Sequence, residues 1–319
     1  MTQVLKYIGN RFTFQETLGG TGLTSVHRGL DVSNGSEVAV KILRSYFSQE
    51  PGLVSSYFEE LKRVQGLRDQ RVLTPLDMGE DYEGSWVAYP FVSWPNLEQV
   101  LRRGSISPES ALAILRQIAE ALDRAHAQEI WHGDLKPTNV FVSPDGEVRV
   151  SDFGMFILAA GAHPLIRSNL NTPHPCYTAP ELTQYPAPDG ASDQYALAAI
   201  AYEMLTGRLP FSGVGAATVQ AQQMTGNPEP PTGANPRLPP ECDRPLLRAL
   251  ARHPLERYQR PGEFVDALDR GTDTIRSLAR VLKALHRYVT EEAGEMGLEG
   301  VQEMADAAVE EVAGHDLSM

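Results

Sequence analysis

Two polar loops in the middle of the chain, separated by a short strand-like segment, constrain its fold more than any other feature. The first loop, at 132–139, has the sequence HGDLKPTN, and the second, at 152–154, has DFG. Phosphoryl transfer needs a proton-accepting carboxylate, metal ligands and a cation at set positions, because the protein contributes mostly positioning and charge stabilisation. The loops supply these groups as Asp134, Lys136, Asn139 and Asp152.

The order and spacing of these loops resemble those of bacterial eukaryotic-like (Hanks-type) Ser/Thr protein kinases, from about residue 11 to residue 270. The resemblance implies that Asp134 accepts the proton of the substrate hydroxyl and that Lys136 stabilises the transferred phosphoryl group. It also implies that Asn139 and Asp152 hold Mg²⁺ or Mn²⁺. Either motif alone is more often a capped turn, but the two together favour the kinase interpretation.

The segment upstream of the loops carries the expected ATP-binding residues. VAVK at 38–41 predicts a strand, and the resemblance implies that Lys41 grips the α- and β-phosphates. In the helix that follows, alignment with the family pattern makes Glu60 the partner that orients Lys41, with Glu59 as the competitor. Successive helical residues face about 100° apart, so only one of the two can point at the lysine. The resemblance also implies nucleotide contacts from Gly19, Gly20, Gly22, Val26, Ala39, Tyr89 and Phe91.

The glycine-rich turn departs from the GxGxxG pattern of protein kinases. Gly19 fits the first position, but Thr21 and Thr24 stand at the second and third. Glycines allow backbone N–H groups to approach phosphates with no side chain in the way. We therefore expect hindered phosphate approach, with Gly20 and Gly22 restoring some flexibility. A glycine-containing hairpin with weak nucleotide contact stays open as the alternative.

The activation segment ends at Ala179-Pro180-Glu181, and the resemblance implies an ion pair between Glu181 and Arg257. Gly133 precedes the base, where regulated kinases carry an arginine that binds a phosphorylated side chain of this segment. We therefore expect activity that does not depend on phosphorylation of the activation segment. His174 stands where Ser/Thr kinases have a threonine near the base, which leaves substrate selection open.

Hydrophobic spacing predicts a strand-rich segment followed by a mainly helical one, and the resemblance implies that they form an α+β, bilobal protein-kinase-like fold over 1–271. A small β-rich lobe is expected at about 7–89 and a larger, mainly α lobe at about 97–271, where Ser107-Pro108 supplies a helix start. Two prolines make 90–96 the candidate hinge between the lobes. The proline-rich stretch at 227–240 is expected to be a long surface loop.

The chain changes character at 272–319, which we expect to be a helical acidic tail. A basic amphipathic segment at 273–290 precedes an acidic one at 291–312 that has apolar residues at helical spacing. Two interpretations stay open. The first segment packs on the large lobe and the end frays, or the two segments form a hairpin that makes a homodimer or binds a regulatory protein.

Bulk composition narrows the location and the partners. The net charge of −13 disfavours binding to nucleic acid or to an anionic membrane. Two cysteines in 319 residues are not a disulfide framework, and no apolar segment is long enough for a signal peptide or a membrane span. We expect a cytoplasmic protein whose partners are ATP and a protein substrate, with no nucleic acid and no membrane.

Three functions compete. An active Ser/Thr protein kinase leads, because Lys136 two residues after the base follows the Ser/Thr pattern. A pseudokinase, which binds nucleotide as a scaffold with little or no transfer, is the alternative that Thr21, Thr24 and His174 motivate. A small-molecule phosphotransferase of the aminoglycoside-kinase type is indicated only by HGD at 132–134, and the rest of the large-lobe pattern argues against it.

Overall fold

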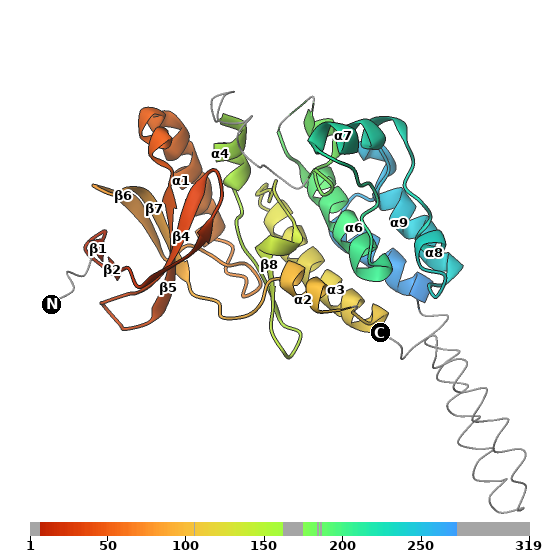
Figure 1. The fold of residues 1–319 in the computed structure, drawn as a ribbon, viewed down its shortest axis with the longest axis horizontal. Coiled ribbons are helices and arrows are strands. Elements are labelled where there is room, and N and C mark those ends of the chain that lie inside the picture. Colours follow the sequence, from red (N-terminus) through yellow and green to blue (C-terminus); the bar gives the residue numbers. More distant parts are fainter. Residues whose placement is uncertain (1–6, 105, 162–174, 184, 186, 273–319) are drawn as a thin grey trace, which may run out of the picture.

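The computed structural model arranges the chain in two lobes, a smaller lobe built on a sheet and a larger, mostly helical lobe (Figure 1). This is the α+β, bilobal architecture that the sequence predicts. The connection between the lobes runs between β7 (Gly84–Pro90) and α2 (Leu97–Arg103). The structure describes residues 7–104, 106–161, 175–183, 185 and 187–272.

The smaller lobe contains an antiparallel sheet with the strand order β3-β4-β5-β7-β6. Val38, Val40 and Ile42 of β5 are buried on one face of this sheet, where they pack with Phe12 and Trp86. The alternate residues of β5 therefore face the opposite side. The remaining strands are β1 (Tyr7–Ile8), β2 (Phe12–Thr13), β3 (Glu16–Gly20), β4 (Thr24–Leu30), β5 (Glu37–Leu43) and β6 (Asp77–Asp81).

Helix α1 (Pro51–Gln65) follows a short 3-10 turn, η1 (Ser45–Gln49), and begins with a proline, which suits the first helical position. Its buried residues recur every three or four positions and form a stripe: Val54, Tyr57, Glu60, Leu61 and Val64. Part of this stripe packs in one cluster with Met155 and Leu158 of α4 (Met155–Gly161). Figure 1 shows α4 beside α1, so the start of the activation segment lies against the small lobe.

The larger lobe is organised around α6 (Gly190–Thr206), whose residues are almost all buried. Side-chain caps begin several helices: Asn96 caps α2, Ser107 caps α3 (Pro108–His126) and Asp189 caps α6. The other elements are η2 (Pro137–Asn139), β8 (Val140–Val142), β9 (Val148–Val150), η3 (Pro180–Thr183), α7 (Ala216–Thr225), α8 (Pro231–Ala234), η4 (Pro240–Cys242), α9 (Asp243–Ala249), η5 (Pro254–Glu256) and a helix over 261–272.

The stretch at 227–240 is not the continuous surface loop that we expected. It contains α8, whose Thr232 is hydrogen-bonded through its backbone and hydroxyl to Asp243, at 2.9 and 2.6 Å. Asn235 donates to the carbonyl of Leu205 at 2.8 Å. The prolines here start short helical turns, because proline suits the first helical position. These side-chain bonds fasten the stretch to α6 and α9.

Two further expectations concern membrane-spanning segments and the acidic tail. In the part of the chain that the structure describes, no helix combines the length and the apolar character that crossing a membrane requires. The acidic tail, apart from Thr272, lies outside the described residues.

Candidate active site

Asp193 of α6 attaches the first polar loop to this helix, and its side chain is 1% exposed. The carboxylate accepts the backbone N–H groups of His132 and Gly133, each at 2.8 Å, and contacts Nε2 of His126 at 2.8 Å. Burial alone would raise the pKa of Asp193, but the bond from His126 and the other donors outweigh burial and lower it. The loop backbone is therefore held by a buried, ionised carboxylate.

His132 connects the two polar loops from inside the core, where it is fully buried. Its Nε2 contacts the carbonyl of Ser151 at 2.9 Å, and its Nδ1 contacts the backbone N–H of Asp134 at 3.2 Å. A carbonyl can only accept and a backbone N–H can only donate, so the imidazole is neutral with its proton on Nε2. Burial lowers the pKa of His132, which keeps the ring in this form.

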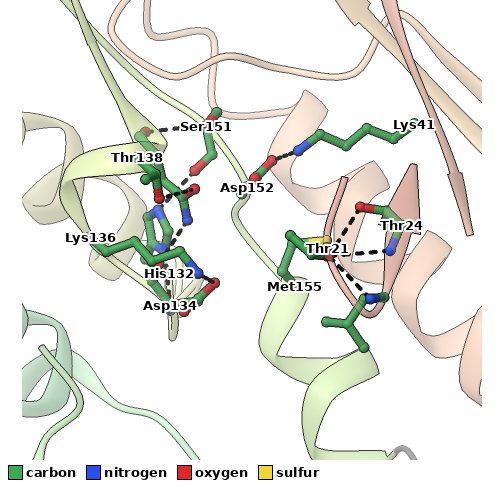
Figure 2. A network of polar contacts seen from close by, with 12 residues as sticks. Thr21, Thr24, Lys41, His132, Asp134, Lys136, Thr138, Ser151, Asp152 and Met155 are labelled. Atoms are coloured by element: carbon green, nitrogen blue, oxygen red, sulfur yellow. Dashed lines mark hydrogen bonds and ion pairs between the residues drawn. The ribbon is translucent and has the colours of Figure 1, made fainter. Parts of the chain in front are cut away.

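Three of the predicted residues, Asp134, Lys136 and Asn139, lie together on the first loop, and Figure 2 shows Lys136 beside Asp134. Lys136 Nζ is 2.6 Å from the Asp134 carboxylate, and the Asn139 amide donates to the Asp134 carbonyl at 2.8 Å. Both side chains of the ion pair remain about one-fifth exposed, at 22% for Asp134 and 17% for Lys136. The carboxylate is thus accessible to a substrate hydroxyl.

The second loop presents Asp152 to the small lobe. Its backbone adopts a φ of +70°, which is uncommon for a residue other than glycine, and its carboxylate forms an ion pair with Lys41 of β5 (Figure 2). Burial lowers the pKa of Lys41 to about 7, the charge of Lys136 adds to this shift, and the Asp134 carboxylate opposes it. The structure therefore brings Lys41 and Asp152 into direct contact.

Glu60 does not have the partner that we expected. Among the described residues, Lys41 pairs with Asp152, and Glu60 pairs instead with Arg63 one turn later on α1, at 2.7 Å. Arg63 also donates to the carbonyls of Gln128 and Glu129 after α3, at 2.8 and 2.9 Å. The expected Lys41–Glu60 pair is absent because α1 carries its own cation for Glu60 while Asp152 occupies Lys41.

Helix α4 holds α1 in this position through two contacts. Tyr57 donates to the sulfur of Met155 at 3.2 Å, and Leu53 lies against Gly161. Tyr89, which we expected to contact nucleotide, is 3% exposed and packs in the same buried cluster as Tyr57, with Lys41 Nζ 5.4 Å from its ring centre. Tyr57 was missed by sequence reasoning, although its place in the buried stripe of α1 is a usable signal.

In the glycine-rich turn between β3 and β4, two backbone N–H groups are hydrogen-bonded to a side chain of the turn itself (Figure 2). The hydroxyl of Thr21 accepts the N–H groups of Leu23 and Thr24, at 3.1 and 3.3 Å. Outside the turn, Arg44 binds the carbonyl of Thr21 and Tyr46 binds that of Gly22. The hindrance expected from Thr21 thus has a mechanism, because its hydroxyl occupies two N–H groups that could otherwise bind a phosphate.

The sheet face above these loops carries the other expected nucleotide contacts. Val26 pairs with Lys41 across β4 and β5, and Ala39 pairs with Tyr89, so these side chains share one face. Gly19 and Gly20 pair with Val26 and Ser25 at the edge of the same sheet.

Phe91 lies at the front of this face beneath an arginine. The guanidinium of Arg28 is 4.6 Å from the ring centre of Phe91, and it pairs with Glu16 and Glu37. Sequence reasoning missed Arg28, although it lies two residues from Val26 and hence on the same face. Phe91 therefore presents only part of its ring to the space between the lobes.

The end of the activation segment is fastened to the large lobe as predicted. Arg257, which is 3% exposed, makes a two-pronged ion pair with Glu181 at 2.7 and 2.8 Å. Its remaining N–H groups bind backbone carbonyls, so the buried cation is fully paired. The Glu181–Arg257 prediction is confirmed, whereas His174 lies outside the described residues.

Comparison with known proteins identifies a family whose chemistry fits the geometry of these two loops. Residues 12–259 match the protein kinase domain. Pkn1, a Ser/Thr protein kinase of Myxococcus xanthus, is 33% identical over 261 residues, which are 81% of this chain and 38% of Pkn1. PknA, a Ser/Thr protein kinase of Mycobacterium tuberculosis, is 32% identical over 267 residues, which are 82% of this chain and 61% of PknA. The chain therefore spans less than two thirds of the length of these relatives.

Solved structures give the same result for the fold. The kinase domain of Mycobacterium tuberculosis PknI superimposes with a TM-score of 0.67 at 25% identity, and the match covers 85% of this chain and all of that domain. The family match at 12–259 includes both lobes and both polar loops of the site. By sequence and by structure, the chain belongs to the protein kinase domain family.

Proposed function

We propose that this chain is a Ser/Thr protein kinase, which transfers the γ-phosphoryl group of ATP to hydroxyl groups of a protein substrate. The observation that carries this proposal is the grouping of Asp134, Lys136 and Asn139 on one loop, with the Asp152–Lys41 pair facing it. The Ser/Thr protein kinases Pkn1 and PknA, to which the chain is similar, support the same activity. Base, cation and metal ligands are all present.

Each residue has a role that its chemistry allows. The exposed carboxylate of Asp134 accepts the hydroxyl proton, and Lys136 beside it stabilises the charge of the transferred group. The amide oxygen of Asn139 and the carboxylate of Asp152 are hard oxygen donors, which fit Mg²⁺ or Mn²⁺. When bound, the metal neutralises phosphate charge. We favour Mg²⁺, because it is usually held by one or two carboxylates together with substrate phosphates.

The described conformation requires one exchange of partners before transfer. Asp152 must leave Lys41 to bind metal, and Lys41 must then find another anion, either the phosphates or Glu60. Pairing of Lys41 with Glu60 requires α1 to move relative to α4, because Arg63 holds Glu60 and the contacts of α4 hold α1. We infer that movement of α4 accompanies the onset of activity.

We also propose that activity is independent of phosphorylation in the activation segment. Gly133 offers no cation there, and the ring of Phe156 occupies the adjoining space. Arg149, a cation on β9, lies over the ring of Trp94, 5.2 Å from the ring centre. Treatment with a phosphatase should leave the rate unchanged. A large loss that autophosphorylation restores would contradict this proposal.

One experiment tests the proposed activity. Radiolabelled ATP with Mg²⁺ or Mn²⁺ and casein is incubated with the wild type, with Asp134→Ala and with Asp145→Ala, which removes a carboxylate from the exposed turn between β8 and β9. Incorporation should be lost in Asp134→Ala alone. Absence of incorporation with either metal, despite measurable nucleotide binding, would favour the pseudokinase scaffold. The observation that favours this alternative is that the hydroxyl of Thr21 already binds two N–H groups of its turn.

We also propose a cytoplasmic location and a protein partner for the acidic tail. Cys176 and Cys242 are both free and buried, which supports a cytoplasmic, reducing compartment. We propose that the acidic tail at 272–319 makes a homodimer or binds a regulatory protein. Sedimentation of the full chain from low to high micromolar concentration tests self-association. A constant monomeric mass would exclude the homodimer.

A further inference from the structure

Gln223 on α7 is a buried amide that the catalytic roles leave unused. Its side-chain nitrogen lies 3.0 Å from the carbonyl of Pro175, 3.1 Å from that of Thr178 and 3.3 Å from the hydroxyl of Tyr195. The residue is 3% exposed. One side chain of α7 therefore binds both ends of the turn at 175–178.

The orientation of this amide follows from the chemistry of its neighbours. The two carbonyls can only accept, so the nitrogen of Gln223 must face them. Its oxygen Oε1 is buried with no hydrogen-bond partner among the described residues. An unsatisfied buried acceptor costs stability, so the side chain satisfies the turn at the expense of its own oxygen.

The turn that Gln223 holds lies beside the base. Thr178 donates its N–H to the carbonyl of Pro175 at 3.3 Å, which closes the turn. Tyr177 and Thr178 line the same small cavity, of about 20 Å³, as Asp134 and Lys136. A shift of the turn would therefore move Tyr177 and Thr178 relative to Asp134, and so change the space through which a substrate hydroxyl approaches the carboxylate.

We propose that Gln223 is a positioning residue for the protein substrate. By binding the carbonyls of Pro175 and Thr178 it sets the position of the turn next to the base, and so governs how the acceptor binds. The nucleotide is held by β4, β5 and the second polar loop, none of which Gln223 contacts through a hydrogen bond in the described residues. Its effect should fall on the acceptor and not on ATP. This inference rests on the proposed kinase activity.

Steady-state kinetics with casein and ATP test the inference. Gln223→Glu preserves the shape but turns a carboxylate oxygen toward two carbonyls, and Gln223→Met removes the donors without adding charge. Gln223→His retains an N–H donor. The matched control is Gln222→Glu, because Gln222 lines a groove with Phe211 on another side of the same helix. It changes the charge of α7 equally without facing the turn.

Gln223→Glu and Gln223→Met should lower kcat/KM for casein about tenfold or more, since two bonds to the turn are lost. KM for ATP should stay close to that of the wild type, although the midpoint of thermal unfolding should fall because two buried carbonyls lose their donor. Gln223→His should recover part of the loss, and Gln222→Glu should match the wild type. Equal falls in the casein and ATP parameters would mean a general structural role and would overturn the inference.

Hydrogen exchange provides a readout that does not depend on activity. In Gln223→Met, the amides of 175–178 should exchange faster, while those of 132–139 and of α6 keep their protection. Unchanged exchange at 175–178 would overturn the inference. If the wild type transfers no phosphate to casein, the proposed activity fails, and the exchange experiment still decides whether Gln223 positions the turn.

Discussion

The ring of Phe156 lies against the backbone of Gly133, in the space that a side chain at position 133 would need. A Cβ atom on Gly133 would come within 2.6 to 2.8 Å of Cδ1, Cγ and Cβ of Phe156. Gly133 also has a φ of +72°, which disfavours other residues. The residue before the base and the start of the activation segment therefore depend on each other.

Gly133→Ala should destabilise the protein by about 1–3 kcal/mol, from the positive φ and the overpacking against Phe156. A double-mutant cycle with Phe156→Ala measures the part of the cost that comes from the ring, because the smaller side chain removes the contacts with Cδ1 and Cγ and leaves the contact with Cβ and the backbone strain. The free energy of unfolding in urea is measured for the four proteins. Additive effects would mean that Phe156 and position 133 do not interact.

Arg63→Met should tighten metal-dependent ATP binding, because it frees Glu60 to pair with Lys41 and so releases Asp152 for the metal. We expect up to about a fivefold fall in Kd, since Arg63 is 47% exposed and exposed ion pairs contribute ~0–1 kcal/mol. Lys62→Met removes an exposed charge from the same helix and serves as the control. Weaker ATP binding in Arg63→Met alone would show that Arg63 supports the site.

Thr21→Val should tighten ATP binding about threefold to tenfold, because it releases the N–H groups of Leu23 and Thr24 for phosphate while the shape stays similar. Thr21→Ser keeps the hydroxyl and should resemble the wild type. Adenosine has no phosphate, and its affinity should not change in either variant. Titration calorimetry with both ligands checks this. Weaker ATP binding by Thr21→Val would mean that the hydroxyl itself contacts the nucleotide.

The stability of the protein should fall as the pH falls below about 6.5, the usual pKa of histidine. Burial lowers the pKa of His132, so below pH 6.5 the unfolded chain binds a proton that the folded protein does not. The contribution is at most about 1.4 kcal/mol per pH unit. Urea unfolding between pH 5 and 8 should show a shallower slope for His132→Asn. His253→Asn, at an exposed position, should keep the slope of the wild type.

The parts of the site that lie within one short stretch of sequence could be predicted. Asp134, Lys136 and Asn139 are at most five residues apart, so the loop that carries them brings them together whatever the lobes do. Ser107 starts α3 as expected, with its hydroxyl accepting the N–H of Ser110 at 3.2 Å. These features depend on local backbone chemistry, which the sequence states directly.

The partner of Lys41 could not be predicted, because it depends on how α1 and α4 pack. Glu60 and Asp152 are both able to pair with the lysine, and the choice is made by Met155 and Tyr57, whose contact spans 98 positions of sequence. The hydroxyl of Thr21 was expected to obstruct by its bulk, yet it acts through hydrogen bonds. Such choices between equivalent polar partners are made by tertiary packing.

Asp193 has a consequence for how the molecule can move. Because it ties the first polar loop to α6, Asp134, which we propose as the base, travels with this buried helix of the large lobe. Lys41 travels with β5 of the other lobe. Opening and closing of the two lobes therefore changes the distance over which the phosphoryl group must pass, while the direction from which the base approaches the acceptor stays constant. An enzyme built this way can control its reaction through the distance between the lobes alone, while the loop that carries Asp134 keeps its structure.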